Sequence, residues 1–181
     1  LGYVRVDLPV GHPDFGKLFR CPRNHGAVDE ERLETLRKVG NLGVFADKTF
    51  DNFTFDLPYL NAQQRASLRA AYEVAQAYAR DPHGWLVLEG TYGCGKTHLA
   101  AAVANTRLNM DETVLLVTAP DLLDHLRTTY GPSSEVGYDE MFDRLRNVRM
   151  LVLDDLGVEN PSQWAQEKLF QLLNYRYNRQ L

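Results

Sequence analysis

The sequence predicts an α/β fold: a parallel sheet in a three-layer αβα arrangement, with a small N-terminal extension. Two observations predict it. Between residues 85 and 181, short apolar runs alternate with helical patterns, which is typical of parallel strands joined by crossover helices. A glycine-rich stretch, GTYGCGKT at 90–97, stands between the first apolar run and the helix that follows. We expect two parts, the extension over residues 1–40 and the α/β domain over residues 41–181.

The extension is expected to hold two short elements. Residues 1–24 carry three prolines and three glycines behind an alternating YVRV start, which predicts an extended or hairpin element. Residues 28–40 carry an apolar stripe at helical spacing between a capping Asp29 and a terminating Gly40, which predicts a helix.

Cys21 in the extension has His12 and His25 nearby. These are scattered ligand types without a C-x-x-C pair, so zinc is the weaker interpretation for them. The chain's other cysteine, Cys94, is far away in sequence, and this sparse usage suits a reducing cytoplasm.

The α/β domain opens with a helix over 62–81, capped by Asn61 and ended by Asp81 and Pro82. Apolar runs and helical periodicity predict the elements after it in alternating order. They are a buried strand at 85–90, a helix at 96–108, a strand at 113–120, helices at 121–130 and 138–148, a strand at 149–157 and a helix at 162–181.

Composition and net charge alone name no partner. Hydrophobic residues make up 44% of the chain and charged residues 24%, and no apolar run approaches the roughly 20 residues of a membrane helix. A net charge of -4 gives no global attraction to nucleic acid or to anionic lipid. Any contact with DNA therefore needs a local basic face, for which Arg127, Arg144, Arg146 and Arg149 are candidates. A solvated, ion-paired face is the commoner outcome for such charges.

The stretch 90–97 satisfies the pattern G-x-x-x-x-G-K-[ST] in the strand-to-helix context that gives it meaning. Its glycines let backbone N–H groups curl around the phosphates of ATP or ADP at a helix N-terminus. Lys96 reaches the β and γ phosphates, and the Thr97 hydroxyl ligates Mg²⁺. The candidate nucleotide-binding residues here are Gly90, Gly93, Cys94, Gly95, Lys96, Thr97 and His98. For Cys94 a small filler is favoured over a redox role, and for His98 a packing or hydrogen-bonding role over a phosphate contact.

A second acidic part of the site is expected where the strand MLVLDD ends. Four apolar residues bring Asp154 and Asp155 to the carboxyl end of that strand, where ligands gather in open α/β sheets. We expect Asp154 to hold Mg²⁺ through water, and Asp155 to polarise the attacking water. Lys96 and Asp155 are thus the candidate catalytic residues. The alternative is that the two carboxylates only cap the following turn.

These motifs resemble a known family. The stretches TFDNF, WLVLEGTYGCGKTHLAAAVAN, LLVTAPDLLDHLR, LVLDDLG and WAQEKLFQLLNYRYNRQL are similar to AAA+ P-loop ATPases of the bacterial replicative helicase loader type (DnaC/DnaI-like). The transposition helper ATPases (IstB-like) are close relatives of that family. The resemblance runs from about Thr49 to the end of the chain. It implies a cytoplasmic, self-associating ATPase that engages single-stranded DNA and a replicative hexameric helicase, and no membrane.

Further expectations follow from the resemblance alone. Phe50 and Phe53 of TFDNF would lie near the adenine, and the two helices between the second and third strands would contact DNA. The family's polar sensor strand and arginine finger have no counterpart before Leu181, so we expect the AAA+ domain to be incomplete at its C-terminus. The extension resembles the trailing half of a zinc ribbon.

Three alternatives to a helicase loader stay open at this point. A transposition helper would share the same core, and its transposase would take the helicase's place. A small-molecule kinase would need an arginine-rich lid, whereas residues 118–149 offer helices. A scaffold that binds nucleotide without hydrolysing it is the third.

Overall fold

The computed structural model describes residues 3–5, 18–20, 40–55, 57–58, 60–129, 137–157 and 162–181. The chain forms two compact units, Leu1–Thr35 and Leu36–Leu181. In the first unit, β1 (Tyr3–Arg5) pairs antiparallel with β2 (Leu18–Arg20), which confirms the predicted hairpin element.

Several predictions for the extension lie outside the described residues. They concern the helix over 28–40, except its final Gly40, and the group of Cys21, His12 and His25. The domain boundary between residues 40 and 41 also stays a prediction.

The second unit is built on a parallel pair of strands. β3 (Val114–Thr118) lies beside β4 (Met150–Asp154), with Val114 opposite Met150 and Thr118 opposite Asp154. Successive side chains of β3 point to opposite faces, as the twofold periodicity of a strand requires. Leu115 packs in one core cluster and Leu116 in another. Both faces of the sheet are therefore available for helices.

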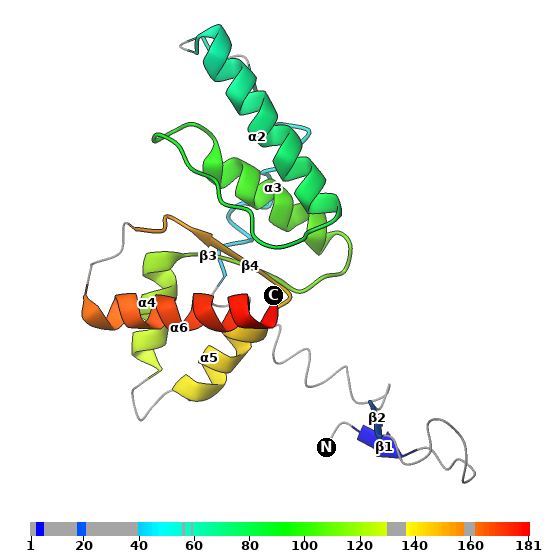
Figure 1. The fold of residues 1–181 in the computed structure, drawn as a ribbon, viewed down its shortest axis with the longest axis vertical. Coiled ribbons are helices and arrows are strands. Elements are labelled where there is room, and N and C mark those ends of the chain that lie inside the picture. The colour runs from blue at the N-terminus through cyan, green and yellow to red at the C-terminus, as the bar shows by residue number, and fades with distance from the viewer. Residues whose placement is uncertain are drawn as a thin grey trace. The chain divides into compact units, whose positions relative to one another are not determined.

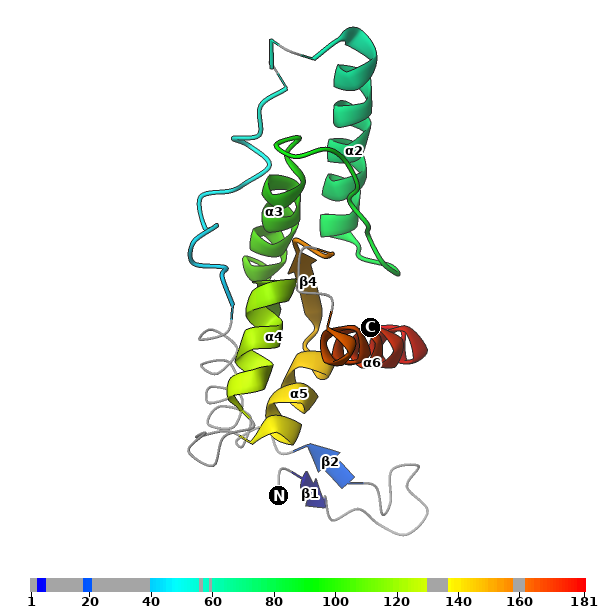
Figure 2. The ribbon, with the colours of Figure 1, turned by 90° about the vertical axis from the view of Figure 1, so that its left-hand side faces the viewer.

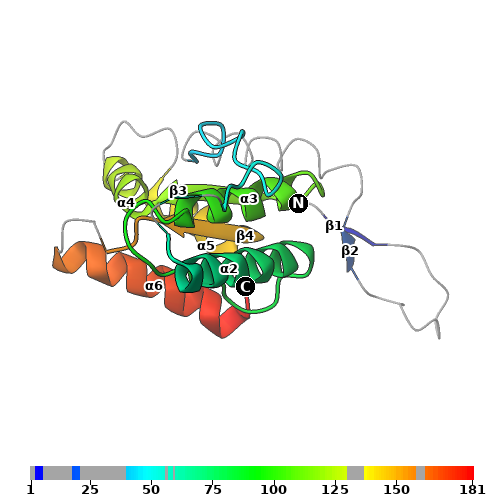
Figure 3. The ribbon, with the colours of Figure 1, turned by 90° about the horizontal axis from the view of Figure 1, so that it is seen from above.

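Helices cover the two faces in separate layers. α2 (Ala62–Arg80) and α3 (Lys96–Leu108) lie on one face, and α4 (Ala119–Thr128), α5 (Tyr138–Asn147) and α6 (Gln163–Arg179) pack with the other (Figures 1 and 2). Seen from above, β4 lies between α3 and the long α6 (Figure 3). This confirms the three-layer αβα arrangement. No helix of the described residues has the length and apolar character needed to cross a bilayer.

Side-chain caps set where three of the helices begin. The Asn61 side chain accepts a hydrogen bond from Gln64 N, and the Asn61 backbone N–H donates one to Gln64 Oε1. Ser162 caps α6 through Ala165 N at 3.2 Å. Thr118 caps α4, so this helix begins at Ala119, two residues before the predicted start.

The predicted buried strand at 85–90 is wrong. The structure has no strand there, and the exposed fractions of Trp85 and Val87 are 47% and 69%. Leu86 and Leu88 alone point inward, toward the cluster that contains Met150. A strand needs a hydrogen-bonded neighbour, and within the described ranges no strand pairs with this segment. It is an extended segment with one apolar face.

A buried arginine ties α2 to α3. Arg107 is 8% exposed, and its Nη1 donates to the carbonyls of Ala79 and Arg80 at the end of α2, both at 3.2 Å. Its Nε donates to Glu112 Oε2 at 2.9 Å. One guanidinium thus satisfies helix-terminal carbonyls and neutralises a carboxylate.

We expect Arg107→Met to lower the free energy of unfolding by about 3 kcal/mol, because it leaves Glu112 and the α2 carbonyls without their buried partner. The matched control is Lys48→Met, which removes an exposed ion pair to Asp47 and should cost about 1 kcal/mol or less. Chemical denaturation of both variants measures this difference. Equal losses in the two variants would show that Arg107 acts as an ordinary surface cation.

Candidate nucleotide-binding site

The glycine-rich stretch forms a loop that leads directly into α3. Gly95 is the N-cap of α3 at φ +94°, in the left-handed region. A Cβ built on Gly95 would lie 3.0 Å from Cε2 of Phe53, so glycine is required for both conformation and space. Gly93 also has a positive φ, +73°. The two glycines bend the loop back over the start of the helix.

The N-terminus of α3 differs from those of the other described helices. α2, α4 and α6 are capped by side chains, and α5 has two acidic residues in its first turn. α3 has neither a side-chain cap nor an acidic residue in that turn. Its first N–H groups therefore lack both a capping acceptor and a compensating charge. Such a helix end favours an anion, and phosphate is the one that best suits a glycine loop.

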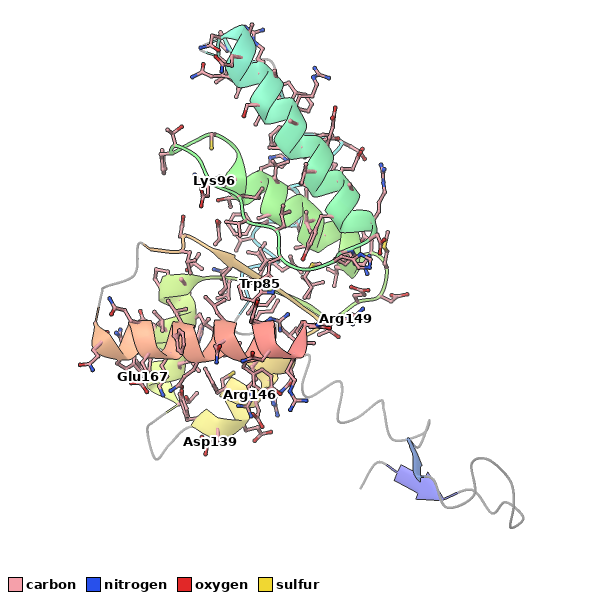
Figure 4. All side chains as sticks on the ribbon, in the orientation of Figure 1. Trp85, Lys96, Asp139, Arg146, Arg149 and Glu167 are labelled. Carbon is pink, nitrogen blue, oxygen red and sulfur yellow. The ribbon has the colours of Figure 1, made fainter. Side chains whose placement is uncertain are left out.

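Lys96 brings the positive charge. Its Nζ donates hydrogen bonds to the carbonyls of Gly90 and Thr91 at 3.0 and 2.9 Å, so the ammonium lies inside the curve of the loop. Figure 4 shows Lys96 at the start of α3, beside the end of β4. A phosphate oxygen would be a stronger acceptor than a carbonyl oxygen because it is charged.

Cys94 fills the base of the loop. Its Sγ would lie only 2.8 Å from a Cβ built on Gly90, and it is 3.9 Å from Lys96 Nζ. The thiol is half-buried and free. These contacts fit the filler interpretation of Cys94. Tyr92, at the tip of the same loop, is fully exposed.

Asp154 and Asp155 end β4. Asp154 is half-buried opposite Thr118, and Asp155 is exposed, with a left-handed φ of +51°. Because β3 and β4 are parallel and α3 packs on both, the carboxyl end of β4 lies at the edge of the sheet where α3 begins (Figure 1). Neither carboxylate makes a hydrogen bond or ion pair with another described residue. Carboxylates with open coordination suit Mg²⁺, which takes one or two of them together with substrate phosphates.

A segment that we name the strap, residues 41–53, runs antiparallel along α3 toward the loop (cyan in Figure 2). At its start, Asn41 N donates to Leu116 O of β3 at 2.7 Å. Further along, Asn105 of α3 donates to the carbonyls of Phe45 and Lys48 at 2.9 and 2.7 Å. The strap is thus fixed to the sheet and to the far half of α3.

The strap ends at the loop. His98 Nε2 lies 2.8 Å from Thr49 O and 3.1 Å from Asn52 Oδ1. The Phe53 ring packs against His98 at 5.1 Å between centroids and meets Gly95. His98 thus contacts the strap, as the hydrogen-bonding interpretation predicts; a contact with phosphate stays a prediction.

The two phenylalanines predicted near the adenine differ in position. Phe53 lies against the loop, whereas Phe50 packs edge-on against Tyr72 of α2 at 5.4 Å, and its carbonyl accepts from the Tyr72 hydroxyl at 3.1 Å. A contact of either ring with the adenine stays a prediction.

The sequence did not lead us to predict the roles of Asn52 and Asn105 in the strap. The role of Asn105 could have been suspected from the sequence, because Asn105 is a polar residue at the end of the apolar run AAAVAN.

The candidate basic face on α4 and α5 is largely ion-paired. Arg144 is buried and pairs with Glu140, Arg146 pairs with Asp143, and Arg127 pairs with Asp124. Arg149 is exposed. The ion-paired interpretation is therefore confirmed for Arg127, Arg144 and Arg146. Away from the loop, a cavity of about 250 Å³ lies between the strap, α2 and α3; polar residues such as Gln76 and Asn109 and apolar residues such as Phe50 and Ala102 line it together.

Known proteins resemble this chain along most of its length. The sequence profile of the family described as "IstB-like ATP binding protein" matches residues 21–181. The replicative helicase loader DnaC of Buchnera aphidicola subsp. Acyrthosiphon pisum is 24% identical over 151 residues, which are 82% of this chain and 59% of the relative. The uncharacterized protein YdaV of Escherichia coli K12 is 32% identical over 160 residues, which are 87% of this chain and 61% of YdaV. The chain spans less than two thirds of either relative.

Two solved structures show the same fold. DnaA from Aquifex aeolicus with AMPPCP bound superposes with a TM-score of 0.60 at 22% identity, covering 74% of this chain and 39% of that one. The replication initiator DnaA bound to AMPPCP and single-stranded DNA gives a TM-score of 0.57 at 24% identity, again over 74% of this chain and 39% of that one. The predicted P-loop NTPase fold of the AAA+ type is confirmed.

Proposed function

The chain belongs to the IstB-like ATP-binding protein family, and we propose that its loop Gly90–Thr97 binds Mg·ATP and that the protein hydrolyses it. The observation that carries this proposal is the start of α3, a helix with neither cap nor acidic first turn that follows a glycine loop holding a lysine ammonium. The N–H groups and the ammonium together make a site for a polyphosphate.

Each residue of the site has a proposed role. Backbone N–H groups of the loop bind phosphate oxygens, and Lys96 neutralises the β and γ phosphates. Thr97 and Asp154 hold Mg²⁺, which would offset the negative charge of the phosphates. Asp155 orients the attacking water and accepts its proton. Phe50 and Phe53 are proposed to lie near the adenine, and His98 near the phosphates.

The proposed cellular role is that of a cytoplasmic helicase loader in DNA replication. Two relatives support it: DnaC is named a replicative helicase loader, and one DnaA structure holds single-stranded DNA. The proposed partners are a replicative hexameric helicase and single-stranded DNA. The second candidate, a transposition helper, is favoured by the name of the matching family. A kinase is disfavoured because α4 and α5 stand where an arginine-rich lid would be needed.

Phosphate release separates these functions. The protein is incubated with Mg·ATP, with and without single-stranded DNA, a replicative helicase or a transposase. We expect slow release without additions, and faster release with DNA and helicase together. Release that requires a small-molecule acceptor would indicate a kinase, stimulation by transposase alone would indicate the helper, and no release would indicate a scaffold.

We further expect the ATPase activity per molecule to rise with protein concentration. Among the residues that the structure describes, Lys96 is the cation whose side chain contacts the loop. Charge developing on the transferred phosphoryl group needs a further cation, and an arginine from a neighbouring molecule supplies about 10³–10⁵ in rate in other P-loop NTPases. The test is to measure ATP turnover per molecule at increasing protein concentration, with self-association followed by light scattering on the same samples. Activity per molecule that stays flat from below to above the self-association range would contradict a shared site.

A further inference from the structure

We propose that His98 is a positioning residue of the phosphate loop. It holds the turn Thr49–Phe53 at the end of the strap, and this turn keeps the Phe53 ring against Gly95. The inference rests on the proposed nucleotide site and adds to it a support that lies outside the pattern G-x-x-x-x-G-K-[ST] at 90–97. Its expected consequence is a change in nucleotide affinity rather than in global stability.

The turn is closed by one amide side chain and attached to α3 by the histidine. Asn52 Oδ1 accepts from Thr49 N at 3.0 Å and from Thr49 Oγ1 at 3.1 Å, while Asn52 Nδ2 donates to Asp47 O at 2.6 Å. His98 Nε2 faces two acceptors, Thr49 O and Asn52 Oδ1. A nitrogen between two acceptor oxygens must carry the hydrogen, so His98 is the donor.

Phe53 transmits the position of the turn to the loop. Its ring stands edge-on to His98, with an interplanar angle of 89°, and two of its ring carbons would lie 3.0 and 3.1 Å from a Cβ at Gly95. Gly95 is the residue at which the free N–H groups of α3 begin. The ring therefore fills the space directly behind the backbone that would bind phosphate. On its other side Phe53 packs with Phe55 and Tyr72, at 5.3 and 5.6 Å.

The strap has attachments that do not depend on His98. Asn41 bonds to β3, and Asn105 holds the carbonyls of Phe45 and Lys48. Loss of the His98 contacts should therefore release the turn 49–53 while the rest of the strap stays in place. Asn105 lies about two helical turns further along α3, so it offers a matched control for loss of a strap anchor away from the loop.

The test measures the dissociation constant of Mg·AMPPCP by calorimetry, with the melting temperature alongside, on the whole chain. His98→Gln keeps an amide donor that reaches the same acceptors, His98→Phe keeps a ring without the donor, and His98→Ala loses both. We expect binding to weaken about tenfold in His98→Ala and His98→Phe, which is the loss of one such hydrogen bond at the site. His98→Gln should stay within about threefold of wild type, and Asn105→Ala should lower the melting temperature with affinity kept.

The outcomes separate this inference from the proposed function. Equal affinity in wild type and His98→Ala overturns the inference alone. So does a loss in His98→Gln as large as in His98→Ala, or an equal loss of affinity in Asn105→Ala. A wild-type chain that binds no Mg·AMPPCP overturns the nucleotide site and the inference with it. If His98→Ala does not fold, Phe53→Leu removes the ring edge at Gly95 but keeps apolar packing, and unchanged affinity in that variant overturns the inference.

Discussion

In a Lys96→Ala variant we expect the affinity for Mg·ATP to fall at least about 100-fold. The ammonium lies within the curve of the loop, on the carbonyls of Gly90 and Thr91, and would exchange these acceptors for phosphate oxygens. Contacts between charged groups are each worth about 1.5–3 kcal/mol, so the loss of two of them gives a factor of this size. Calorimetry with a non-hydrolysable ATP analogue measures it.

The matched control for this variant is Lys168→Ala. Lys168 lies on α6, where it donates to Gln171 and stacks over Tyr138, away from the loop. Removal of the Lys168 side chain should leave the affinity for Mg·ATP unchanged. A folded Lys96→Ala variant that binds as tightly as Lys168→Ala would mean that the loop is not the phosphate site.

For Asp155→Asn we expect near-normal nucleotide binding and a fall in hydrolysis of about 100-fold or more. The amide keeps the size of the side chain but cannot accept the proton of the attacking water. Asparagine also tolerates the left-handed backbone of this position, φ +51°, as well as aspartate does, so the fold should be unaffected. Binding and single-turnover hydrolysis, measured on the same preparation, separate the two effects.

The companion variant Asp154→Asn tests the assignment of roles. Removal of a Mg²⁺-holding carboxylate should weaken the response of binding to Mg²⁺, whereas Asp155→Asn should leave that response unchanged. Turnover that persists in Asp155→Asn and disappears in Asp154→Asn would show that the two roles are reversed.

Elements with local signals could be predicted from the sequence. α3 has the bounds that GKTHLAAAVANTRL indicates, because the glycine turn fixes its start and a run of alanines favours helix. α2 begins after Asn61 as predicted, since the capping box is a local pattern. The segment 85–90 has an apolar pattern as strong as that of β3, yet it forms no strand. Strand formation depends on a partner in space, which an apolar run does not encode.

In the candidate site, too, residues with a local sequence signal could be predicted and residues that depend on distant partners could not. Gly90, Gly95, Lys96 and Thr97 were predictable because one contiguous pattern contains them. The strap was not, because its anchors join residues far apart in the chain: His98 meets Thr49 across 49 positions, and Asn105 meets Phe45 across 60. The pairing of Arg144 with Glu140 illustrates a third case, in which spacing of four on a helix allows an ion pair but burial decides its importance.

The central claim is that the loop 90–97 is a nucleotide site, and a crystal structure of the chain with Mg²⁺ and AMPPCP tests it most directly. We predict phosphates within the loop and at the first N–H groups of α3, with Lys96 Nζ moved from the carbonyls of Gly90 and Thr91 to the phosphate oxygens. The account would be contradicted by an analogue bound elsewhere, for example in the cavity between the strap, α2 and α3, with Lys96 still on the two carbonyls.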